Sequence, residues 1–395
     1  MDAVRVLLVT FAESFATTCV QRGLYFHSTG RLGFSPAANL WLALGFGLLY
    51  AGAAVLSHRL ADRFTEKGLL LTVVGSQTLV NLGMGAVSFT PAAVVSGALV
   101  MGALNGLKWP VVESYVAAGR GPAEQARAIG RFNVSWALAV PLSVAATGPM
   151  MDLFAGGLFV VAAAISAVSL VLLVPLPARP RHLAATDPLR PTADQMPRLA
   201  SLMRATRWLL LANYSCAWVL AALLPGVLTG LGLALGAAAA VASALDLVRL
   251  AAFPVLQRTS AWHNRLAPLA VAAVLMPAGF FMVFFAPNVA TVLAGEIVFG
   301  LATALTYYAT FYYAMVVRNA AVDAGGGNET LIGLGSAVGP AAALLGFALA
   351  PALGQEAYGM VIGLAPVFVV CFGGAVRSAT AVIRAPHATG GASPQ

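Results

Sequence analysis

The chain has 395 residues, of which 60% are hydrophobic and only 9% are charged, and its formal net charge is +8. A water-soluble domain carries about 25% charged residues, so this composition excludes an ordinary soluble fold. The three cysteines lie inside apolar runs, and the five histidines lie far apart in or near loops. Neither set has the spacing of a metal site. Because no catalytic constellation or phosphate-binding glycine loop is evident either, we expect no metal, no cofactor and no enzymatic activity.

The apolar residues are divided into runs of about 20 residues or more, each long enough to cross a ~30 Å hydrocarbon layer as a helix. We therefore predict an all-α integral membrane protein with twelve transmembrane helices. Their expected positions are approximately 3–27, 36–58, 68–90, 91–118, 127–151, 154–176, 206–230, 233–256, 265–287, 289–317, 328–352 and 357–380. Most connections between them are short, so consecutive helices should be antiparallel neighbours.

One connection, residues 177–205, is longer and rich in proline and arginine. It lies near the middle of the chain and divides the twelve helices into two groups of six. The sequence thus predicts an N-terminal six-helix bundle (1–176), a cytoplasmic linker (177–205), a C-terminal six-helix bundle (206–380) and a cytoplasmic tail (381–395).

The basic residues indicate the orientation in the membrane. Alternate loops, counted from the N-terminus, hold eighteen of the 22 lysines and arginines, and the opposite loops hold only Arg31. Cytoplasmic loops of membrane proteins are enriched in basic residues, so both termini should be cytoplasmic and the membrane should be the plasma (inner) membrane. The positive charge is therefore a topology signal, and we expect no binding to nucleic acid.

A short polar segment, residues 57–67, separates the second and third expected helices. It resembles the loop between these two helices in the major facilitator superfamily, whose pattern is roughly Gly-x-Leu-Ala-Asp-Arg-x-Gly-Arg-Lys. The fitting residues are Leu60, Ala61, Asp62, Arg63 and Lys67, whereas His58, Thr65 and Glu66 depart from the pattern. With the helix count, the linker and the charge alternation, the resemblance covers essentially the whole chain.

The resemblance implies a fold of two six-helix bundles that rock around a central site, exposing it to one side of the membrane at a time. It implies that helices 1, 4, 7 and 10 line the central cavity. It also implies that Asp62 meets the cytoplasmic start of the eleventh helix, near residues 328–331. Asp62 and Arg63 would then act as a conformational latch.

Ionisable residues within the hydrocarbon layer are costly and usually face a partner or a wet cavity. Glu13 and Lys108 lie about 12 Å and about 14 Å from the cytoplasmic ends of their helices, at 1.5 Å per residue. We expect them to form a pair. If the ammonium moved away, the carboxylate would be left in an apolar environment and could take a proton, which would couple transport to protons. A permanent structural pair is the alternative interpretation.

The other candidates for the substrate or proton pathway include three further charged residues. Arg22 is suited to an anionic substrate group or to a gate, Glu113 either faces the cavity or meets the headgroup region, and Glu296 lies towards the outer side. Asp246 and Arg249 are three residues apart on one helical face, so we interpret them as a self-neutralising structural pair.

Polar aromatic residues complete the candidate site. Tyr214 and Trp218 share a helical face beside Asn213, and the tenth helix carries Tyr307, Tyr308 and Tyr312. Rings with a polar tip suit a flat or sugar-like ligand. Tyrosines near a helix end can instead belong to the aromatic belt at the membrane interface.

The leading hypothesis is a monomeric secondary transporter of a small solute, driven by protons, and both uptake and efflux are compatible with the sequence. A non-transporting membrane receptor or assembly factor, or a lipid or amphiphile flippase, could use the same scaffold, because a fold does not define a function. The expected partners are a small-molecule substrate, protons and the lipid bilayer.

Overall fold

The computed structural model describes residues 2–87, 89–154, 156–184, 186–353 and 356–384, and the elements found there are α-helices. The first seven are α1 (Asp2–Gln21), α2 (Gly23–Leu32), α3 (Pro36–Phe64), α4 (Glu66–Val87), α5 (Pro91–Ala117), α6 (Pro122–Leu153) and α7 (Gly157–Leu173). The next seven are α8 (Met196–Gly230), α9 (Leu235–Val241), α10 (Ala244–Arg258), α11 (Ala267–Phe284), α12 (Val289–Val317), α13 (Val322–Leu353) and α14 (Glu356–Arg384).

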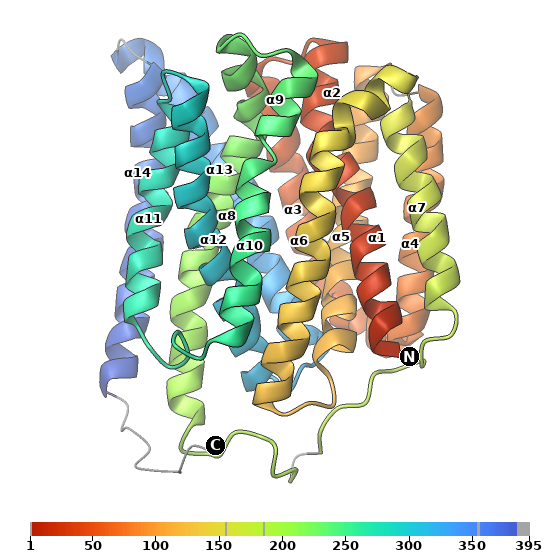
Figure 1. Cartoon of the computed structure of the whole chain (residues 1–395), viewed down its shortest axis with the longest axis vertical. Helices are drawn as coiled ribbons and strands as arrows, with labels where there is room; N and C mark the ends of the chain where they lie inside the picture. Colours follow the sequence, from red (N-terminus) through yellow and green to blue (C-terminus); the bar gives the residue numbers. More distant parts are fainter. Residues whose placement is uncertain (1, 88, 155, 185, 354–355, 385–395) are drawn as a thin grey trace.

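The helices run along the long axis of the molecule, with α1–α7 (the first half) on one side and α8–α14 (the second half) on the other (Figure 1). Within the described residues, 11 helical segments are long and apolar enough to cross a membrane. In this count, α1 and α2 form one span, as do α9 and α10. The shorter apolar helix α7 has 17 residues, which is at the lower limit for a span. The all-α membrane fold with twelve spans is thus confirmed.

Several predicted boundaries are wrong. The expected loop at 57–67 is mostly helical: α3 continues to Phe64, and only Thr65, with φ of 66°, separates it from α4. Helix α8 begins at Met196, so the linker between the halves shortens to residues 174–195. Helix α14 extends to Arg384, so 381–384 are helical, and the rest of the expected tail lies outside the described residues. Charged side chains at helix ends project past the hydrocarbon layer, so polarity alone does not mark where a membrane helix ends.

Helix α13 also begins earlier than expected, at Val322 instead of residue 328, and so includes Gly325, Gly326 and Gly327. These glycines lie within the helix because other helices pack closely against them. A Cβ atom on Gly325 would lie 2.6 Å from a carboxyl oxygen of Glu113, and one on Gly327 would lie 2.8 Å from the guanidinium of Arg207. The glycines permit close approach to other helices, which in lipid is a main source of helix association.

The two halves meet most closely along α3 and α13, which run antiparallel. A Cβ on Gly47 would lie 2.5 Å from the backbone of Ser336, and one on Gly333 would lie 2.6 Å from the backbone of Ala51. Nearer the linker, a Cβ on Gly326 would lie 3.1 Å from the carbonyl oxygen of Ala54. We call this line of backbone contacts the α3–α13 seam.

Replacing Gly47 with leucine should therefore lower the stability by about 1–3 kcal/mol, because neither backbone can yield without separating the halves. Gly52→Leu is the matched control, since Gly52 lies on the same helix and no atom lies within 4 Å of its added Cβ. Thermal unfolding of the purified protein in detergent measures the difference. Equal midpoints for the two variants would show that the seam tolerates a side chain.

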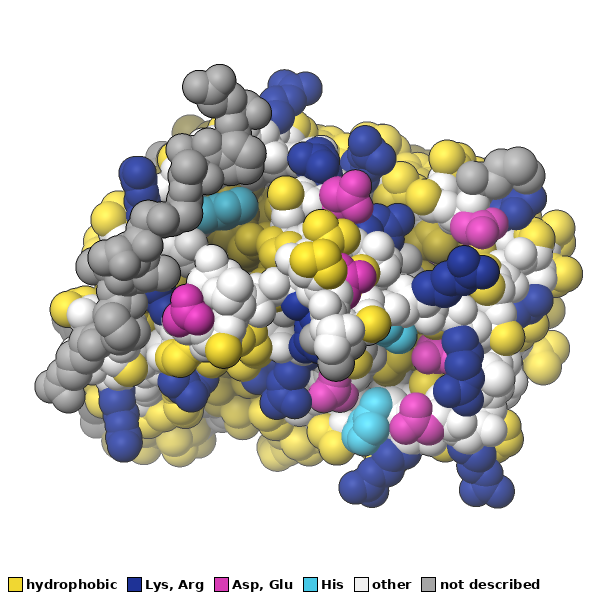
Figure 2. All heavy atoms as spheres, turned by 90° about the horizontal axis from the view of Figure 1, so that it is seen from below, with side chains coloured by type: hydrophobic (Ala, Val, Ile, Leu, Met, Phe, Trp, Pro, Cys, Tyr) yellow, Lys and Arg dark blue, Asp and Glu magenta, His cyan; other side chains and the backbone are white. Residues whose placement is uncertain are grey.

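The two ends of the molecule carry different parts of the chain. The linker face carries the N-terminus and the linker, and the far face carries α2 and α9 (Figure 1). In a view onto the linker face, lysine and arginine side chains are distributed around it (Figure 2).

Candidate functional site

A cavity of ≈ 170 Å³ lies between the two halves. Its wall is built by α1, α3, α5 and α6 of the first half and by α8, α10, α12 and α13 of the second. Most of the lining is apolar or aromatic. Six ionisable residues also line it: Arg22, Glu113, Asp246, Arg249, Glu296 and Glu329.

On the far side of the cavity, two interrupted helices meet. The first transmembrane span breaks at Arg22, between α1 and α2, and the eighth breaks at Ala242 and Ser243, between α9 and α10. The guanidinium of Arg22 forms an ion pair with Asp246 and donates to the carbonyl oxygen of Ala242 at 3.2 Å. Helix breaks expose backbone groups that can bind charged partners. Here the two breaks lie opposite each other, and the Arg22 side chain connects the halves at the far end of the cavity.

Asp246 binds a second arginine in addition to Arg22. The Nη1 of Arg249 donates to Asp246 at 3.2 Å, and the carboxyl group of Glu296 lies close to both Arg22 and Asp246. The predicted Asp246–Arg249 pair is thus formed. The prediction of a self-contained structural pair is wrong, however, because both residues line the cavity and Asp246 also binds Arg22 across the halves.

On the linker side of the cavity, two carboxyl groups from different halves are neighbours. Glu113 of α5 lies beside Glu329 of α13, and the Tyr50 hydroxyl donates to Glu329. Further contacts join the halves towards the linker face. The Ser114 hydroxyl donates to the carbonyl of Ala320 at 2.9 Å, and the linker backbone at Leu183 accepts from the Asn319 amide at 3.0 Å. Contacts between the halves therefore lie on both sides of the cavity.

Aromatic rings form much of the wall. Trp136 lies edge-on to Tyr307 with ring centroids 5.3 Å apart, and Trp218 lies 5.6 Å from Phe46. Tyr214 lies 6.3 Å from Tyr307. Of the predicted polar aromatics, Tyr214, Trp218 and Tyr307 line the cavity.

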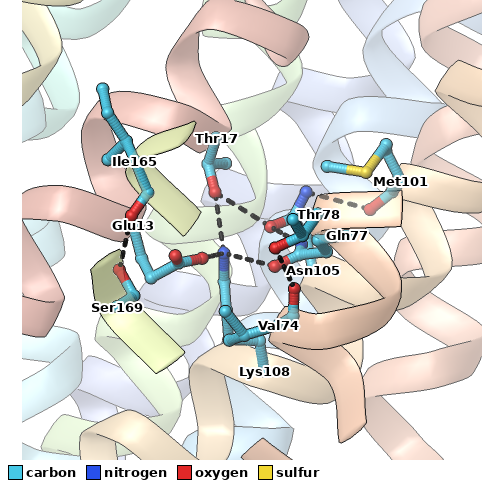
Figure 3. A network of polar contacts seen from close by, with 10 residues as sticks. All are labelled: Glu13, Thr17, Val74, Gln77, Thr78, Met101, Asn105, Lys108, Ile165 and Ser169. Carbon is cyan, nitrogen blue, oxygen red and sulfur yellow. Dashed lines mark hydrogen bonds and ion pairs between the residues drawn. The ribbon is translucent and has the colours of Figure 1, made fainter. Parts of the chain in front are cut away.

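Glu13 and Lys108 form the predicted pair, with Nζ and Oε2 2.7 Å apart (Figure 3). The ammonium also donates to the Thr17 hydroxyl at 2.8 Å and to Gln77 Oε1 at 3.1 Å. Neither charged residue lines the cavity, and both have 0% exposure. Thr17 does line the cavity, as does Trp109, whose ring centroid lies 4.7 Å from the ammonium, so both residues connect this network to the cavity. The role of the pair in proton coupling stays a prediction.

Other candidates lie outside the cavity. Asn213 accepts a 3.0 Å hydrogen bond from Thr303 inside the second half, and Tyr308 donates to the carbonyl of Ala126 at 2.8 Å across the halves. Tyr312 stacks on His263 near the linker face, with centroids 4.8 Å apart. Burial lowers the pKa of His263, so this imidazole is neutral near pH 7.

The latch residues are on the surface of the linker face. Asp62 is exposed, and its backbone carbonyl accepts a hydrogen bond from Arg179 of the linker at 3.0 Å. The Arg63 guanidinium lies 5.4 Å from the ring centroid of Phe64. His58, rather than Asp62, lines a hollow together with Gly326 and Gly327 of α13. The latch stays a prediction.

Tyr50 and Glu329 are among the polar residues of the cavity that sequence reasoning missed. The expected helix begins at residue 328, which puts Glu329 at a helix end, whereas α13 begins at Val322. The signal that could have found Glu329 is the acidic residue in Asn328-Glu329-Thr330, which is followed by a long apolar run. Within the described ranges, no group of three or more His, Cys, Asp or Glu residues could hold a metal ion.

A family model described as Major Facilitator Superfamily matches residues 6–340. No curated protein matches the sequence. Three solved structures with a similar fold illustrate its structural relatives. The human organic anion transporter MFSD10 (TETRAN) has a TM-score of 0.69 and 14% identity, over 94% of this chain and 98% of its own.

A bacterial homologue of the human drug peptide transporters PepT1 and PepT2 has a TM-score of 0.68 and 15% identity, over 98% of this chain and 99% of its own. The transporter FucP in the outward conformation has a TM-score of 0.62 and 13% identity, over 96% and 98% of the two chains. At these identities the similarity shows the fold alone.

Proposed function

The chain belongs to the major facilitator superfamily, and we propose that it moves a small solute across the membrane by alternating access, coupled to protons. It is an integral, multi-pass membrane protein and a transporter rather than an enzyme. The substrate, the mechanism and the coupling are the proposed part.

The observation that carries the proposal is the position of the cavity. It lies between the halves, and contacts between the halves flank it on both sides: Arg22 with Asp246 towards the far face, and Tyr50 with Glu329 towards the linker face. A site enclosed in this way is what a carrier needs when it passes between its two open forms. Breaking one set of contacts while keeping the other would open the site to one side only.

We assign the proton to the carboxyl pair of Glu113 and Glu329. Two adjacent carboxylates away from water repel each other and are poorly solvated, so binding one proton between them is favourable. Both line the cavity, and each comes from a different half. A proton bound there would act on the substrate site and on the contact between the halves together. Glu13 with Lys108 is the second candidate, since Thr17 connects that pair to the cavity.

The orientation follows from the basic residues. We propose that the linker face, with its lysines and arginines (Figure 2), is cytoplasmic, that both termini lie there, and that the membrane is the inner (plasma) membrane. We further propose that the first and second halves act as two rigid bundles joined by residues 174–195, and that a monomer is the working unit.

The structural relatives do not select a substrate. Their names refer to organic anions, peptides, fucose and nucleosides, which are chemically unlike one another. Of these, an organic anion would suit the arginines of this cavity best.

The proposed function is tested with the purified protein in liposomes, by following a panel of labelled solutes with and without a pH gradient. At least one solute should be concentrated on one side when the gradient is present, and only equilibrate when it is absent. A solute carried at the same rate and to the same ratio in both conditions would contradict proton coupling. Movement of labelled lipid between leaflets, with no solute transported, would instead identify a flippase. The absence of any flux would favour a receptor.

A further inference from the structure

Arg249 of α10 has hydrogen-bonding capacity that its surroundings do not use. The side chain lines the cavity and the residue is 8% exposed. Its Nη1 donates to Asp246 at 3.2 Å. In the part of the chain that the structure describes, Nε and Nη2 make no hydrogen bond of normal geometry, although the Tyr214 hydroxyl lies close to this guanidinium. Buried donors are nearly always paired with an acceptor, so a group from outside the protein is the natural partner of these two.

The guanidinium is also held in a defined orientation. Its carbon lies 4.4 Å from the ring centroid of Trp136 and 5.8 Å from that of Tyr307. Nη1 is bound to Asp246 on the same helix, which fixes one end of the group. The opposite edge, formed by Nε and Nη2, presents two parallel N–H groups. This is the geometry that binds the two oxygens of one carboxylate.

We propose that Arg249 binds the carboxylate of an organic acid through Nε and Nη2, and that the aromatic wall of the cavity receives the apolar or aromatic body of this ligand. This proposal deepens the proposed function, since it names the substrate class of the same cavity. The wall beside Arg249 includes Trp136, Tyr307 and Tyr214, whose faces and edges pack well on a ring.

The other charged residues of the cavity affect how tightly Arg249 can bind a carboxylate. Arg22 and Arg249 carry two positive charges, and Asp246 and Glu296 balance them when both are ionised. An incoming carboxylate then adds one negative charge to the cavity that Glu296 also lines, and one oxygen of Glu296 lacks a hydrogen-bond partner among the described residues. Removing the charge of Glu296 should therefore strengthen binding of the acid, whereas removing that of Arg249 should weaken it.

The test is equilibrium binding to the full-length protein in detergent by titration calorimetry, with benzoate as the probe. Benzamide and benzylamine are its neutral and cationic counterparts, and phenyl phosphate is the alternative oxyanion. Benzoate should bind at least about tenfold more tightly than benzamide and benzylamine, because a bidentate charged hydrogen bond is worth at least this factor.

The variants separate charge from geometry. Arg249→Gln should weaken benzoate binding about tenfold or more, and Arg249→Lys should also weaken it, because an ammonium keeps the charge but lacks the planar pair of donors. Glu296→Gln should strengthen it. Arg31→Gln, at an arginine that does not line the cavity and contacts Asp152 at 3.7 Å, should leave it unchanged.

Three results would overturn the proposal: tighter binding of benzylamine or phenyl phosphate than of benzoate, equal affinity in the Arg249 and Arg31 variants, or no binding of any probe. If Arg249→Gln does not fold, Arg249→Lys and Glu296→Gln decide the question. Because binding is measured without a pH gradient, these results are independent of coupled transport. A protein that concentrates other solutes but ignores benzoate would retain the proposed function and lose only this inference.

Discussion

Glu113→Gln should abolish transport that a pH gradient drives, while substrate exchange across the membrane continues. Neither oxygen of Glu113 accepts a hydrogen bond among the described residues, whereas Glu329 accepts one from Tyr50. That bond would stabilise a negative charge on Glu329, so we assign the proposed proton of the pair to Glu113. An amide fills the same space but cannot release a proton. In the parent protein, one proton per substrate would support an accumulation ratio of up to about tenfold per pH unit, and in the variant the ratio should fall to 1.

The measurement is the steady-state ratio of labelled substrate in liposomes at a fixed pH gradient, with exchange at equal pH as the second readout. Glu124→Gln is the matched control, since it makes the same chemical change at an exposed position at the start of α6. Loss of exchange as well as driven transport would indicate damage to the cavity. An unchanged ratio in Glu113→Gln would remove Glu113 from the proton pathway.

Lys108→Met should lower the stability of the protein by about 3–5 kcal/mol. Glu13 and Lys108 are both completely buried and lie 2.7 Å apart, and the ammonium also contacts Thr17 and Gln77 (Figure 3). Removing the ammonium leaves the Glu13 carboxylate without its counter-charge in a low-dielectric interior, which is far more costly than removing the pair as a whole. Thermal or denaturant unfolding in detergent measures the loss.

The double variant Glu13→Leu with Lys108→Met is the informative comparison, because replacing both members of a buried ion pair by apolar residues of similar size is often neutral or stabilising. It should recover most of the stability lost in Lys108→Met. Transport by the double variant then distinguishes a structural role of the pair from a role in proton coupling. Driven transport that persists in the double variant would identify the pair as structural, and its selective loss would assign the pair to proton coupling. A double variant as unstable as Lys108→Met would contradict the electrostatic explanation.

The twelve spans, the division into two halves by a proline-rich linker and the pairing of Glu13 with Lys108 could be predicted from the sequence. Each depends on information that is local or periodic: apolar runs of sufficient length, basic residues in alternate loops, and depth along a helix at a fixed rise per residue. The errors at helix ends, at Phe64 and Met196 for example, arise because a polar residue on a helix end extends beyond the apolar layer without interrupting the helix.

The centre of the site could not be predicted in the same way. The neighbouring carboxyl groups of Glu113 and Glu329 are 216 positions apart in the sequence, and the residues around each of them do not predict that the two meet. Likewise, Arg22 and Asp246 meet only because two helices break opposite each other. Such contacts depend on how the halves pack. The glycines before the expected start of α13 belong to this helix, because they let it pack closely against other helices.

The α3–α13 seam constrains how the two halves can move. At Gly47, Gly333 and Gly326 the backbone of one helix lies directly against the other helix, and between these points the Tyr50 hydroxyl donates to Glu329. Backbone atoms in such close contact cannot move closer together without a steep rise in energy. If the two halves move as rigid bundles, as we propose, these contacts would let them tilt against each other at the seam but not separate along its whole length. The seam would then act as a pivot: a tilt that widens the gap at one end of the molecule would narrow it at the other, so both ends could not be open at once.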